Sequence, residues 1–262
     1  MFRKALWDLR WTTFWYAVGA ASYTFLIALY FPVVRDQAAT IQKLIATYPK
    51  ALLALFGIRD LATFSGFMGA ETLNLIWPAI ILVFATMAGG AVVAKEVEDG
   101  TVELWLSVPA RRWRLLLGKL AALAVGLLAT VAACVIALVL GAALVHASLT
   151  PAGLLAMAAV MTAFLFTVGA YSCLLSSLTS SRAHAAGLSL GVTMASYLAW
   201  VVANLSRDWE WLKNVSVFTA YTPQAALEDG RLEAAPMAVL LLITALCALL
   251  AILGFERRDA TA

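Results

Sequence analysis

Few residues in this chain have the types and the spacing that catalysis requires. The segment Gly187–Gly191 reads Gly-Leu-Ser-Leu-Gly, which matches the Gly-x-Ser-x-Gly pattern around the nucleophile of many serine hydrolases. An intramembrane serine protease would also need a histidine base on a later span. No histidine follows His184, which precedes Ser189 on the same apolar stretch. We therefore favour a helix in which glycine and serine allow close packing, with the protease as an alternative interpretation.

The sequence also lacks the patterns that bind nucleotides or metals. Around Gly118-Lys119-Leu120, both the upstream glycine and the hydroxyl residue of a phosphate-binding loop are missing. The chain has two histidines and three cysteines, and the cysteines lie inside apolar stretches without a metal-binding spacing. We therefore predict no metal site and no cofactor in this chain.

The composition indicates an integral membrane protein. Of 262 residues, 63% are hydrophobic and 13% are charged, against about 25% charged residues in a typical soluble domain. A soluble globule of this size could not cover its surface with so few charges, and a disordered chain would not carry so many apolar residues. The net charge of +3 is too small to indicate nucleic-acid binding.

Runs of apolar residues predict an all-α membrane protein with six transmembrane helices. Hydrocarbon about 30 Å thick requires roughly 20 apolar helical residues per crossing. The uncharged run 120–181 is too long for one crossing, but Thr150 suits a helix cap and Pro151 suits the first turn of a new helix. The predicted spans are about 14–34, 72–94, 120–145, 152–176, 185–205 and 236–255.

An even number of spans places both chain ends on one side of the membrane. Lysine and arginine are more numerous in the loops on the N-terminal side, which predicts that both ends are cytoplasmic. Residues 1–13 predict a helix at the membrane interface, anchored by Trp7 and Trp11. The outer loop 35–71 is predicted to contain short amphipathic helices.

Residues 95–119 concentrate charge between two uncharged spans. Acidic residues precede a turn and basic residues follow it. Gly100 can end one helix, and Pro109 can end a short second helix before the next span begins. A short charged helix held between two spans suits docking to a soluble partner, while an ordinary solvated loop with snorkelling arginines is the alternative.

This segment resembles the permease subunits of bacterial type 2 (exporter-class) ABC transporters. The matching residues are Glu96, Gly100, Thr101, Glu103, Leu106, Pro109, Arg112 and Lys119. The ending Phe255–Asp259 and the outer segment 48–66 are similar to the same family. The resemblance therefore covers nearly the whole chain.

The resemblance implies a single transmembrane permease domain over residues 1–262. Two copies would pair, as a homodimer, and bind two copies of a separate ABC ATPase in the cytoplasmic membrane of a bacterium. The chain itself would not be an enzyme, because ATP and Mg²⁺ would be bound by the ATPase. A membrane scaffold or assembly subunit without transport is the alternative.

The resemblance also implies a coupling helix at 97–108 that would be seated in a cleft of the ATPase. Glu96, Glu98, Thr101 and Glu103 would hold or orient this helix. Gly100 and Pro109 would set its geometry, and Arg112 would anchor it at the lipid–water boundary.

Polar and aromatic residues of the second and fifth spans are candidates for a substrate pathway at the dimer interface. These are Asn74, Trp77, Tyr197, Trp200 and Asn204. Ordinary helix packing and an aromatic belt are the alternative for each residue.

Overall fold

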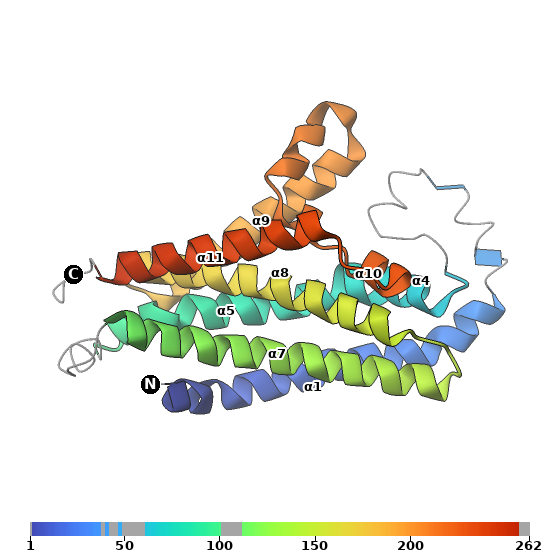
Figure 1. The fold of residues 1–262 in the computed structure, drawn as a ribbon, viewed down its shortest axis with the longest axis horizontal. Helices are drawn as coiled ribbons and strands as arrows, with labels where there is room; N and C mark the ends of the chain where they lie inside the picture. The colour runs from blue at the N-terminus through green and yellow to red at the C-terminus, as the bar shows by residue number, and fades with distance from the viewer. Residues whose placement is uncertain (1, 38–39, 42–46, 49–60, 101–111, 257–262) are drawn as a thin grey trace.

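Six long helices lie side by side in the computed structural model, which describes residues 2–37, 40–41, 47–48, 61–100 and 112–256 (Figure 1). Each is long and apolar enough to cross a membrane, as predicted. The helices that form these spans are α1 (Phe2–Asp36), α5 (Trp77–Glu98) with the two elements before it, α7 (Arg112–Leu144), α8 (Pro151–Leu178), α9 (Arg182–Leu205) and α11 (Ala234–Glu256). No strand occurs within the described ranges, so the all-α fold class is confirmed.

The N-terminus, the end of α5 and the end of α11 lie at the same end of the bundle (Figure 1). The two ends of the described chain therefore lie at one end of the bundle (Figure 1), and their location on one side of the membrane stays a prediction. The placement of that side in the cytoplasm stays a prediction.

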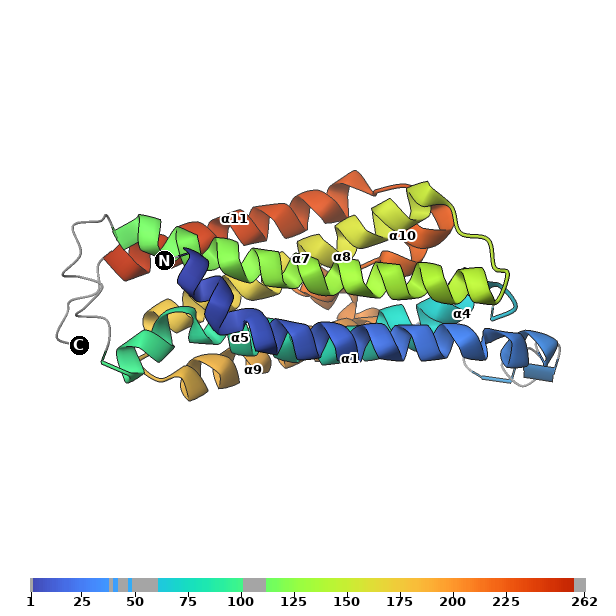
Figure 2. The same cartoon turned by 90° about the horizontal axis from the view of Figure 1, so that it is seen from below.

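The first helix has no break at the predicted boundary near residue 13. α1 runs without interruption over 35 residues, or about 52 Å at 1.5 Å per residue, which exceeds the hydrocarbon thickness. Its first turns bend away from the axis of the remaining helix (Figure 2). An interfacial location for these turns stays a prediction, but they are continuous with the span.

The second span begins earlier than predicted. The sequence predicts that residues 64–71 belong to the outer loop, but α4 (Phe64–Met68) and the π-helix η1 (Gly69–Ile76) lead directly into α5. Thr63 caps this helix by accepting a hydrogen bond from the N–H of Gly66 at 3.2 Å. Hydrophobicity alone does not predict such a cap, and so it does not predict this helix start. Most of the remaining outer loop lies outside the described residues.

The two spans extend into the predicted charged segment 95–119 from both sides. α5 continues to Glu98 and α7 starts at Arg112, so both edges of that segment are helical. The predicted break between the third and fourth spans is confirmed. His146 has a φ of 54°, and Thr150 caps α8 by accepting from the N–H of Gly153 at 3.1 Å.

The helix α8 lies at the centre of the bundle and packs against α5, α7, α9 and α11. The core around it contains the fully buried side chains of Trp77, Phe84 and Phe164. After α9, the chain forms the 3₁₀-helices η2 (Arg207–Asn214) and η3 (Val217–Ala220) and the short helix α10 (Pro223–Asp229). By contrast with α8, α9 and α11 expose many of their apolar side chains.

Candidate functional site

The candidate site is the end of the bundle at which α5 stops. The N–H of Asp99 donates to the carbonyl of Lys95 at 2.9 Å, and the N–H of Gly100 donates to the carbonyl of Val97 at 3.1 Å. Gly100 has a φ of +68°, a left-handed conformation that costs a residue with a Cβ roughly 1–2 kcal/mol. The expectation that Gly100 ends this helix is confirmed.

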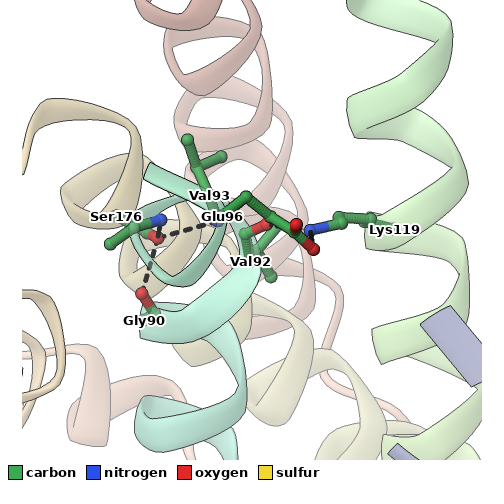
Figure 3. Close-up of polar contacts among 7 residues, drawn as sticks. Gly90, Val92, Val93, Glu96, Lys119 and Ser176 are labelled. Atoms are coloured by element: carbon green, nitrogen blue, oxygen red, sulfur yellow. Dashed lines mark hydrogen bonds and ion pairs between the residues drawn. The ribbon is translucent and has the colours of Figure 1, made fainter. Parts of the chain in front are cut away.

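Two charged side chains, Glu96 and Lys119, join α5 to α7 beside this helix end. Lys119 Nζ lies 2.8 Å from Glu96 Oε1, and the two side chains are only 11% and 12% exposed. The same ammonium group donates to the carbonyl of Val92 at 2.6 Å (Figure 3). Glu96 therefore turns toward the bundle, where it positions the two helices that flank residues 101–111.

The buried hydroxyl of Ser176, on α8, enters the hydrogen-bond ladder of α5. Its Oγ accepts from the N–H groups of Val93 at 3.0 Å and Ala94 at 2.9 Å, and it donates to the carbonyl of Gly90 at 2.5 Å (Figure 3). In a regular α-helix the N–H of residue 94 would bond to the carbonyl of residue 90 directly. A side chain inserted at this point is a recognised cause of a local bend.

Close packing fixes the same part of α5 against its neighbours. A Cβ added to Gly89 would lie 2.7 Å from the Cβ of Ser172 on α8. One added to Gly90 would lie 2.9 Å from the backbone nitrogen of Ala186 on α9. Both distances are shorter than real Cβ contacts, so the two glycines allow three helices to meet here.

A contact from Glu98 completes the connections of this helix end. Its Oε2 accepts from the backbone N–H of Arg182 at 2.7 Å, which satisfies a donor at the start of α9. The last turns of α5 are thus bonded to α7 through Lys119, to α8 through Ser176 and to α9 through Glu98. Residues 101–111 are attached directly to this braced end.

Several predicted coupling residues fall outside the described ranges. These are Thr101, Glu103, Leu106 and Pro109. The backbone of Arg112 begins α7, and its side chain is not described. The sequence motif predicts Glu96 and Glu98 but not Ser176, which is one of several hydroxyl residues in an uncharged span and is not marked out by its type or spacing.

The two pathway candidates of the second span contact the interior of the chain. Asn74 Nδ2 donates to Gln224 Oε1 on α10 at 2.8 Å. Trp77 is 1% exposed, and its Nε1 donates to the sulfur of Cys134 at 2.8 Å. The place of Trp77 therefore favours a role in packing.

The three candidates of the fifth span form a separate group on α9. Tyr197 packs against Trp200 and against Phe218 of η3, with ring centroids 6.0 and 5.3 Å apart. Asn204 Nδ2 donates to the carbonyl of Trp200 at 2.8 Å. Within the described residues, no hydrogen bond or ring contact joins this group to Asn74 or Trp77.

The serine of the Gly-x-Ser-x-Gly match is not placed as a nucleophile. Ser189 is fully buried and its hydroxyl donates to the carbonyl of Ala185, one turn earlier in α9, at 2.7 Å. Gly187 and Gly191, two residues before and after Ser189, lie on an open face of α9. An added Cβ at either glycine would meet no atom within 4 Å. Among the described residues, no helix makes the close approach to these two glycines that the sequence pattern predicts.

The comparisons with known proteins agree with this architecture. The model of the ABC-2 family of transporter proteins matches residues 17–260. That range includes the whole candidate site and all six long helices except the first turns of α1. A search of curated proteins finds none that matches. Because the family match extends over most of the chain, the protein belongs to the ABC-2 transporter family and is a multi-pass membrane permease subunit of an ABC transporter.

Proposed function

We propose that this chain is the transmembrane subunit of an ATP-driven exporter in a bacterial cytoplasmic membrane. Two copies would form the substrate pathway, and two separate ATPase subunits would bind ATP and Mg²⁺. The observation that carries the proposal is the braced end of α5, which is bonded to three other helices directly beside residues 101–111. A force applied to that segment would reach α7, α8 and α9 together.

The proposed coupling element consists of residues 97–108, at the end of this brace. Gly100 supports the role because its left-handed backbone redirects the chain out of α5. Glu96 and Lys119 support it from inside the bundle, because they fix the separation of the two flanking helices. In this arrangement Glu103, Leu106 and Pro109 belong to the surface that meets the ATPase. Thr101 helps to hold the coupling element, and Arg112 anchors it at the lipid–water boundary.

The proposed contact between the two permease copies is a stripe along α9. Its residues recur at spacings of three and four, so they share one helical face, and all of them are exposed. The stripe consists of Gly187, Gly191, Met194, Leu198, Val202 and Leu205. Gly187 and Gly191 form a Gly-x-x-x-Gly pair in open space, the arrangement that lets two membrane helices approach closely.

The proposed substrate pathway follows from this contact. Tyr197, Trp200 and Asn204 belong to the same helix, and a second copy would place two such sets about the dimer axis. Asn74, on η1, is kept as a candidate for this pathway, and its Nδ2 donates to Gln224 within one protomer. Trp77 is left out of this proposal because it is buried within one protomer.

The test is ATP turnover by the assembled complex of permease and ATPase. Gly100→Leu and Glu103→Arg should still insert and dimerise, yet turn over ATP much more slowly than the parent complex. Gly19→Leu is the matched control, because Gly19 lies in a span and an added Cβ there meets no atom within 4 Å. Normal turnover by the first two variants would overturn the coupling assignment.

A further inference from the structure

A cavity of about 510 Å³ lies between the start of α1, the end of α5 and the start of α9. It adjoins the ion pair of Glu96 and Lys119, both of which contribute to its wall. The cavity therefore lies at the same end of the bundle as the candidate site.

The charges around the cavity favour an anionic ligand. Lys95 and Arg182 line it and are exposed, whereas Asp8 is its only lining acid besides Glu96 within the described residues. Glu96 and Lys119 neutralise each other at 2.8 Å. The remaining lining charges thus have a positive excess, and Lys4 is near enough to Lys119 to add to it.

The rest of the wall is mostly apolar. It includes Leu9 from α1, Met87 and Val92 from α5, and Ala186 from α9. Met87 is exposed on the side of a membrane-spanning helix, so the apolar wall continues toward the lipid. A polar, cationic end and an apolar flank together suit a molecule with an anionic head and a hydrocarbon tail.

We propose that this cavity binds one anionic phospholipid of the surrounding membrane leaflet. Lys95 and Arg182 contact the headgroup phosphate, since both line the cavity and are exposed. The first carbons of an acyl chain lie along Met87 and Ala91, and the remainder of the lipid stays in the bilayer. This assignment concerns binding alone and does not depend on the proposed export function.

The first test compares lipid binding by the parent chain and by Lys95→Glu/Arg182→Glu. Native mass spectrometry of the chain in a neutral detergent, titrated with dioleoyl phosphatidylglycerol, gives the affinity. We expect the double variant to bind at least about tenfold more weakly. The control is Lys213→Glu/Arg231→Glu, which makes the same change in net charge at two residues outside the cavity and should leave the affinity unchanged. An equal loss in the control, or no loss in the cavity variant, would overturn the proposal.

The second test addresses the apolar wall and the identity of the ligand. Ala91→Trp fills the flank without changing any charge, and we expect it to weaken phosphatidylglycerol binding as well. Dioleoyl phosphatidylcholine should bind the parent chain much more weakly, and millimolar inorganic phosphate should not displace bound phosphatidylglycerol. Unchanged binding by Ala91→Trp, equal binding of the two lipids, or displacement by phosphate would each contradict a phospholipid site.

Discussion

Removal of the Lys119 ammonium group should strongly destabilise the bundle. In Lys119→Met the carboxylate of Glu96 stays about 90% covered but loses its partner at 2.8 Å, and the carbonyl of Val92 loses a donor. Loss of one member of a buried ion pair costs about 3–5 kcal/mol. The carbonyl of Val92 lies within α5 and keeps its place in the helical hydrogen-bond ladder, so the loss of this second donor adds little. Because both side chains retain some exposure near the end of the bundle, we expect about 3 kcal/mol in the free energy of unfolding.

The assay is a reversible titration with a denaturing detergent, followed by circular dichroism. Lys213→Met is the matched control, since it removes the lysine of a surface pair with Glu210 at 3.0 Å, and it should cost less than about 1 kcal/mol. Glu96→Leu/Lys119→Met removes both buried charges and should recover most of the lost stability. The reasoning is refuted if Lys119→Met costs no more than the control, or if the double variant is less stable than the single one.

Three further changes probe other parts of the molecule. Ser176→Ala removes the hydroxyl that bridges the ladder of α5 and should lower the free energy of unfolding by about 1–3 kcal/mol in the same titration; unchanged stability would contradict the bridge. Gly191→Leu should shift the purified permease from dimer to monomer in light scattering, whereas Gly19→Leu should leave it dimeric. Gln224→Leu removes the buried partner of Asn74 and should cost about 1–3 kcal/mol, measured by thermal unfolding; a neutral result would argue against that bond.

The helices themselves were largely predictable from the sequence. A crossing needs a long apolar run, so the charges at Arg35, Lys95 and Arg182 locate span ends to within a few residues. Thr150-Pro151 and Gly100 were also readable, because capping and left-handed backbone depend on local residue type.

The contacts of the candidate site depend on tertiary packing and could not be predicted in this way. The sequence motif contains both Glu96 and Lys119, but their pairing depends on α5 and α7 lying side by side. Ser176 is 82 residues from Ala94, and hydrophobicity does not show which helix a serine faces. For Ser189 the sequence motif points to a catalytic nucleophile, whereas its hydroxyl donates to a carbonyl of its own helix.

The π-helix before Trp77 is another feature that local patterns missed. Pro78 has no N–H, so a disturbance near it was foreseeable, but the wide turn is stabilised from elsewhere in the chain. Tyr221, which follows η3, donates from its hydroxyl to the carbonyl of Leu73 at 2.9 Å. Burial raises the pKa of Tyr221 well above its ordinary value, which keeps this hydroxyl protonated as a donor.

The most direct test of the central claim is a site-specific cross-link between the permease and its ATPase. A photoreactive p-benzoylphenylalanine in place of Trp105 lies within the proposed coupling element, and the same probe in place of the exposed Trp209 lies on η2. We predict that the probe at position 105 forms a covalent product with the ATPase subunit and that the probe at position 209 does not. A product from position 209 together with none from position 105 would contradict the proposed coupling surface.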